Sequence, residues 1–255
     1  MEDAPQLAAG FFTNRGDYMQ HSLQSMIGFS IKATDGDLGK VSEFYYDDAT
    51  WTIRYMVAET GNWLMGRKVL ISLVALGKPD WESKTFPVNL TCEQVKNSPD
   101  IDTERPVFRQ HEAQLHQYYQ WPQYWETGYG GTFGITPFPL YEIAVSQDAS
   151  DTKRRDDPNL RSSRHVTGYR IHASNGEIGH VSDFMVNDID WTLCNLVVDT
   201  GEWLPGKKVL VPIEWITNVN WNESSVRVDR MRESVKHSPD AHPVKVADVD
   251  NPGSL

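Results

Sequence analysis

Two histidines and a glutamate stand close together in a stretch whose apolar residues recur at near-helical spacing. His111, Glu112 and His116 are side chains of the types that bind metal ions or transfer protons. The spacing of the two histidines differs from the i, i+4 spacing of a zinc-binding helix. We therefore expect no metal at this position and interpret the stretch as the solvated face of a helix.

No other group of residues has the spacing of a catalytic site. The sequence contains no Gly-x-Ser-x-Gly nucleophile elbow. A glycine-rich run at 128–134 has Phe133 where a dinucleotide-binding fingerprint needs its third glycine. We therefore predict that the protein is not an enzyme, with no catalytic, cofactor-binding or metal-binding residues and no cofactor.

The strongest candidate for a functional surface is a dense group of aromatic residues. Its members are Phe108, Tyr118, Tyr119, Trp121, Tyr124 and Trp125. Rings this close together must either pack on the protein itself or form an interaction surface, because large exposed apolar patches are rare on monomers. Tyr and Trp often anchor protein interfaces. We keep both interpretations, which the sequence favours equally.

The elements that must position these rings come from a module that occurs twice. Residues 28–100 align with residues 168–240 at a constant offset, with no insertion or deletion. The recurring residues are mainly glycine, tryptophan and aliphatic residues, which build a fold. Two of them, Trp63 and Trp203, are expected to cover one end of each module, with a ligand platform as the alternative.

Within each copy, short runs of β-branched and aromatic residues alternate with glycine turns, which is typical of strands joined by hairpins. In the first copy the expected strands are 26–33, 38–47, 51–59, 68–74 and 81–90. Thr91 and Gln94 then form a capping-box pattern, which predicts a short helix. The sequence therefore predicts a mostly β fold whose small, bent sheets tend to close into barrels.

The two copies share four sequence patterns: Gly-x-x-Gly-x-Val-Ser-x-Phe, Trp-Thr, Thr-Gly-x-Trp-Leu-x-Gly-x-Lys-Val-Leu and Val-Lys-x-Ser-Pro-Asp. Together these patterns resemble the PRC-barrel family. Known members include the cytoplasmic domain of the photosynthetic reaction centre H subunit and the C-terminal barrel of the ribosome maturation factor RimM. The resemblance implies two small PRC-type β-barrels in tandem, each with a short C-terminal helix, plus an aromatic-rich helical extension and a charged linker. It implies docking in larger assemblies and brings no catalytic residues.

The pattern divides the chain into six segments. They are an N-terminal tail at 1–20, a first PRC-barrel at 21–103, the aromatic-rich extension at 104–145, a linker at 146–162, a second PRC-barrel at 163–247 and a C-terminal tail at 248–255.

Charge and hydropathy exclude several function classes. The net charge is −11, and no basic patch of the kind that binds nucleic acid stands out. No apolar run approaches the roughly 20 residues of a membrane-spanning helix, and the first residues lack the features of a signal peptide. We expect a cytoplasmic, bacterial protein without membrane insertion.

The leading hypothesis is a non-enzymatic, soluble interaction or assembly protein that docks to itself, as in a homodimer, or to a partner complex. A second hypothesis is that a cleft between the barrels, walled by Trp121, Tyr124, Trp125 and Trp203, binds a planar quinone or tetrapyrrole. A third, by analogy to RimM, is a role in ribosome assembly.

Overall fold

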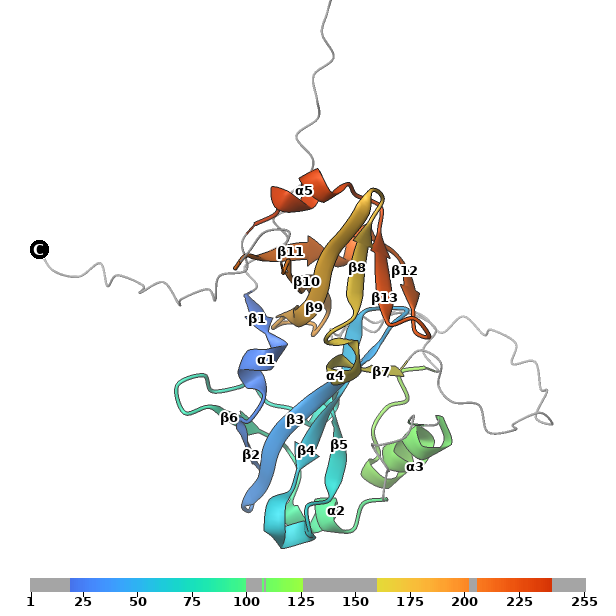
Figure 1. Cartoon of the computed structure of the whole chain (residues 1–255). Helices are drawn as coiled ribbons and strands as arrows, with labels where there is room; N and C mark the ends of the chain where they lie inside the picture. The colour runs from blue at the N-terminus through green and yellow to red at the C-terminus, as the bar shows by residue number, and fades with distance from the viewer. Residues whose placement is uncertain (1–18, 100–106, 108, 126–159, 202–205, 240–255) are drawn as a thin grey trace, which may run out of the picture.

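The chain folds into two β-sheets with short helices around them (Figure 1). The computed structural model describes residues 19–99, 107, 109–125, 160–201 and 206–239, apart from the side chains of 62, 63, 109 and 110. One sheet has six strands and the other has seven. The expected mostly β fold is confirmed.

The six-stranded sheet contains the first repeat, in the order β5-β4-β3-β2-β6. Its strands are β2 (Ser30–Lys32), β3 (Asp37–Asp47), β4 (Thr52–Glu59), β5 (Lys68–Ser72) and β6 (Thr85–Pro87). The 3-10 turns η1 (Gly61–Leu64) and η2 (Leu73–Ala75) flank β5, and α2 (Cys92–Lys96) follows β6. The predicted capping box at the start of α2 is confirmed, with Thr91 and Gln94 each bonding the other's backbone.

The seven-stranded sheet contains the second repeat, in the order β11-β10-β9-β8-β13-β12. Its strands are β8 (Arg170–Ala173), β9 (Gly176–Asn187), β10 (Leu193–Asp199), β11 (Lys208–Pro212), β12 (Ile216–Asn220) and β13 (Ser225–Val228). The 3-10 turn η3 (Ile213–Trp215) precedes β12, and α5 (Arg232–Lys236) follows β13. Each repeat therefore ends with the short helix that was predicted.

The two repeats exchange strands. Strand β1 (Gln20–Ser22) precedes the first repeat but pairs with β9 of the second, and β7 (Leu160–Ser162) precedes the second repeat but pairs with β3 of the first. Each exchanged strand leads into a short helix, α1 (Leu23–Met26) or α4 (Ser163–Val166), and both helices lie between the two sheets in Figure 1. The sheets thus cross the predicted boundaries, since β7 lies in the segment predicted as linker.

Side chains reinforce this exchange at matching positions. The hydroxyl of Ser22 donates to Asp183, and the hydroxyl of Ser162 donates to Glu43. Asp183 holds the same place in the second repeat that Glu43 holds in the first. A single hydrophobic core, which includes Phe44 and Phe184, runs through both repeats. The repeats therefore pack as one body with an approximate twofold axis.

Glycine is required where the start of β3 lies against the end of β4. Gly39 has φ +135°, and a Cβ on it would lie 2.0 Å from the carbonyl oxygen of Glu59. Gly179 stands equally close to the carbonyl of Asp199. The close approach lets each long strand coil sharply over its neighbour, which explains why this glycine occurs in both copies.

Two expectations about the sheets differ from the structure. The first predicted strand, 26–33, is shorter in the structure, where only β2 (Ser30–Lys32) forms. Its predicted start at Met26 is the last residue of α1, which begins where Ser22 accepts a hydrogen bond from the N–H of Ser25. The hydrogen-bonded order of the described strands also stays open in both sheets, so closed barrels are not seen. In each sheet the exchanged strand pairs with part of the long central strand.

Candidate functional site

The aromatic extension covers the outer face of the first-repeat sheet (Figure 1). Along β4, Met56 and Ala58 point into the main core, whereas Tyr55 and Val57 point to the opposite face. Helix α3 (Arg109–Tyr119) packs Leu115 against that second face. The face would otherwise be an apolar surface, so the extension completes the first repeat.

A buried polar cluster lies beneath the helix. The hydroxyls of Tyr55 and Tyr124 each donate to Oε2 of Glu112 at 2.7 Å, and Nε2 of His116 lies 2.7 Å from the hydroxyl of Tyr55. Glu112 is 0% exposed and His116 is 2% exposed. Nδ1 of His116 lies 2.8 Å from the carbonyl oxygen of Pro122. These bonds connect β4, α3 and the segment that follows it.

The hydrogen-bond donors in the cluster determine its charge. The Pro122 carbonyl can only accept, so Nδ1 of His116 carries a proton. If Tyr55 donates to Glu112, Nε2 must donate to Tyr55, which makes His116 a cation beside an anionic Glu112. If Tyr55 donates to His116 instead, Glu112 carries the proton and both groups are neutral.

The interpretation of this helix as a solvated face was wrong at Glu112 and His116. His111 and His116 are not one helical turn apart, but Glu112 and His116 form an i, i+4 pair that shares the buried face with Leu115. His111 is half-buried. The missed signal was a Glu-x-x-x-His spacing within a run of aromatic residues.

The predicted aromatic group divides between packing and surface. Tyr118 is 38% exposed, while Tyr119, Trp121, Tyr124 and Trp125 are half-buried. Tyr119 stacks on Trp121 with ring centroids 4.2 Å apart, and Tyr118 meets the edge of Tyr119 at 4.8 Å. We call Tyr118, Tyr119 and Trp121 the aromatic strip. Phe108 lies outside the described residues.

The remaining predicted positions are only partly described. Trp63 lies in η1, but the structure does not describe its side chain. Trp203 lies outside the described residues. Their role as end covers therefore stays a prediction. The neighbouring Met65 is fully exposed.

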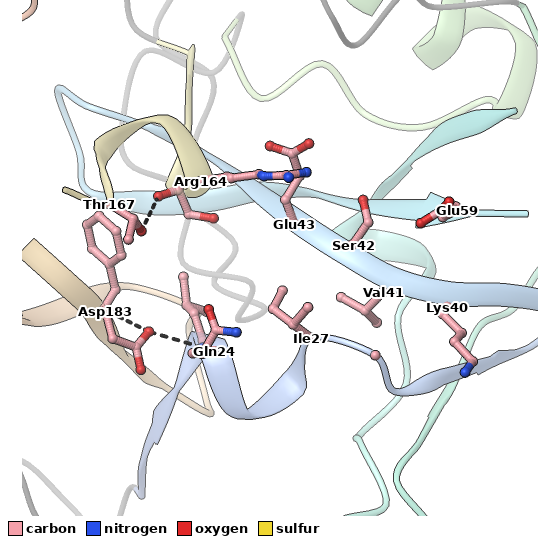
Figure 2. Close-up of a pocket in the computed structure, with 14 residues that line it drawn as sticks. Gln24, Ile27, Lys40, Val41, Ser42, Glu43, Glu59, Arg164, Thr167 and Asp183 are labelled. Carbon is pink, nitrogen blue, oxygen red and sulfur yellow. Dashed lines mark hydrogen bonds between the residues drawn. The ribbon is translucent and has the colours of Figure 1, made fainter. Parts of the chain in front are cut away.

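A pocket of about 530 Å³ lies between the repeats, beside α1 and α4 (Figure 2). It is lined by pairs of matching positions, namely Leu23 and Ser163, Gln24 and Arg164, Ile27 and Thr167, and Glu43 and Asp183. Trp121, Tyr124 and Trp125 do not line it. The aromatic walls expected for a planar ligand between the repeats lie on the outer face of one sheet instead.

Two of the acids that line this pocket, Asp183 and Glu43, differ in their surroundings. Asp183 accepts bonds from the hydroxyl of Ser22 and from the backbone N–H groups of Gln24 and Phe184. Burial nevertheless raises the pKa of Asp183 above its ordinary value, because desolvation outweighs these bonds. Glu43 accepts a bond from the hydroxyl of Ser162 and also faces the pocket (Figure 2). Asp183 thus holds the exchanged segment more firmly.

Other kinds of site find no support within the described part of the chain. No group of three or more His, Cys, Asp or Glu side chains there is arranged to hold a metal ion. Cys92 and Cys194 are both free thiols. No described helix combines the length and the apolar character needed to cross a lipid bilayer.

Comparison with known proteins adds no relative. A scan against protein-family models finds no match, and a search of curated proteins finds none either.

Proposed function

We propose that this chain is a non-enzymatic interaction protein, built from two PRC-type barrel units, that docks to a partner protein or to a second copy of itself. The contact surface is the aromatic strip, which lies at the end of α3 and in the residues just after it. The observation that supports this most is the stack of Tyr119 on Trp121, 4.2 Å apart, with the exposed ring of Tyr118 beside it.

The buried hydrogen bonds beneath the aromatic strip favour the same function. The buried bonds of Glu112 and His116 attach α3 to β4, so the rings have a fixed position before any partner arrives. A preorganised aromatic surface loses little conformational entropy on binding. Tyr and Trp are also the residue types that contribute most to interface affinity.

The test is light scattering after gel filtration of the wild type and the double variant Tyr118→Ala/Trp121→Ala. We expect the wild type to elute above the mass of the 29.0 kDa chain, either alone at raised concentration or with a partner from an extract of its source cells. The variant should elute at the mass of one chain. Met231→Ala, which removes an exposed apolar side chain elsewhere, should behave like the wild type.

Circular dichroism and thermal unfolding would establish that the double variant is folded. A wild type that elutes as a single chain under both conditions would contradict the proposal, as would an association that the double variant retains.

A further inference from the structure

The two exchanged strands, β1 and β7, carry different side chains at one matching position. His21 in β1 corresponds to Arg161 in β7, and each lies on a tryptophan of the repeat that follows it. The ring of His21 stacks on Trp81 with centroids 4.1 Å apart, and the guanidinium of Arg161 lies 4.0 Å from the ring centroid of Trp221. The two tryptophans also hold matching positions. One half of the molecule therefore has a titratable side chain where the other has a permanent cation.

The carboxylate next to each of these side chains is also matched, but its distance differs. In β7, Nε of Arg161 donates to Oδ2 of Asp48 at 2.9 Å. In β1, Oδ2 of Asp188 lies 3.8 Å from Nε2 of His21, which is too far for a hydrogen bond. The other carboxylate oxygen of Asp188 accepts from the backbone N–H of Met19. The charge of Arg161 is thus compensated by a direct bond, which a charge on His21 would lack.

Burial of His21 opposes its protonation. Its Nε2 is buried and makes no hydrogen bond within the described part of the chain. Desolvation therefore lowers the pKa of His21 below its ordinary value of 6.5, although Asp188 acts in the opposite direction. Asp188 faces the imidazole from the turn after β9, and Trp81, in the turn before β6, is uncharged. On β9 itself, Asp183 binds the adjacent Ser22.

We propose that β1 is a pH-sensitive switch: protonation of His21 releases β1 from β9, while Arg161 keeps β7 in place. Docked β1 holds a neutral imidazole, whereas in the released strand the imidazole regains water and accepts a proton more readily. Acidification therefore favours the released strand. Helix α1 follows β1 directly and contributes Leu23, Gln24 and Ile27 to the pocket between the repeats, so release of β1 frees one wall of that pocket.

Proton binding determines the sign and the pH range of the switch. Well above pH 6.5, His21 is neutral in both states of β1, and docking has its full strength. As the pH falls through 6.5, the released strand binds the proton first, and docking weakens until docked His21 is protonated as well. Asp183 acts in the opposite sense, because burial raises its pKa. The contribution of His21 is therefore measured as a difference between wild type and a variant.

The test follows amide hydrogen exchange of residues 19–26 by mass spectrometry, in the full chain at pH 7.5 and pH 5.5, with rates corrected for intrinsic exchange. The control variant is His21→Gln, which has no titratable group at this position. We expect the protection of wild type relative to His21→Gln to fall at least about threefold at pH 5.5. Residues 160–166, which include β7 and Arg161, should keep the same relative protection at both pH values.

An NMR titration of the His21 ring in the wild type needs no variant, so it decides the question even if His21→Gln does not fold. We expect a pKa below 6.5, because burial disfavours the imidazolium. A measured pKa at or above 6.5 would overturn the proposal. Relative protection of residues 19–26 that stays constant or rises on acidification would do the same, as would an equal loss at residues 160–166.

Discussion

Thr52 faces Thr192 in an antiparallel bridge, and the two residues hold the same position in their repeats. On either side, the N–H of Ile53 donates to the carbonyl of Trp191 at 3.0 Å, and that of Leu193 donates to Trp51 at 2.7 Å. The bridge therefore marks the approximate twofold axis. Symmetric pairing of like subunits is the usual solution in homodimers, and here it occurs within one chain.

The exchanged strands make unequal contributions to stability. Asp183→Ala removes the acceptor for Ser22 and for two backbone N–H groups, so we expect a loss of about 2–3 kcal/mol in the free energy of unfolding. Glu43→Ala removes a bond to Ser162 and should cost about 1 kcal/mol. Urea unfolding of both variants measures the difference. Equal losses, or a larger loss for Glu43→Ala, would argue against this assignment.

Because the pKa of Asp183 is raised in the folded protein, the free energy of unfolding depends on pH. In the unfolded chain this carboxyl loses its proton near its ordinary value of 3.8, whereas burial keeps it protonated to higher pH in the folded chain. Stability should therefore fall as the pH rises through this window, because only the unfolded state has released the proton.

The Asp183→Asn variant has no titratable group at this position, so its stability should lack this pH-dependent contribution. Urea unfolding at a series of pH values gives the difference in stability between wild type and variant, which should decline as the pH rises above about 4. A difference that is constant with pH, or that grows, would show that the carboxyl is not protonated by burial.

Much of the fold could be predicted from the sequence because its signals are local. The glycine turns and the alternation around Tyr55 and Val57 marked the strands, and Thr91 marked the start of α2. The exchange of β1 and β7 could not be predicted, because these strands are three residues long and their partners belong to the other repeat.

The close approach between the start of β3 and the end of β4 provides a sharp test of backbone geometry. Gly39→Ala would place a methyl group 2.0 Å from the carbonyl oxygen of Glu59, so we expect a loss above about 4 kcal/mol or failure to fold. Gly28→Ala is the matched control, since Gly28 also has a positive φ but open space around it. It should cost about 1–2 kcal/mol. Similar losses in thermal unfolding would contradict the close approach.

Cys194 should be an unreactive thiol. Burial, with Asp190 and Glu214 nearby, raises the pKa of Cys194 to about 11. In a Cys92→Ser background at pH 8, we expect iodoacetamide to label Cys194 about two orders of magnitude more slowly than a free cysteine. Urea should restore the ordinary rate. Equal rates in the folded and unfolded chain would mean that the thiol is not buried as described.

The candidate site was only partly predictable. The density of rings from Tyr118 to Trp125 indicated both packing and surface, and the structure contains both. The burial of Glu112 and His116 was missed, because a charged residue in a helix is usually solvated. Tyr55, on a strand distant in the sequence, gives these two side chains a buried partner.

The two repeats form one body that holds the extension in place. Differential scanning calorimetry of the full chain tests this most directly. The exchanged strands and shared core predict a single transition whose van't Hoff and calorimetric enthalpies agree, and Asp183→Ala should shift that whole transition. Two separate transitions, with Asp183→Ala moving only one of them, would show that the repeats fold independently and would contradict the account.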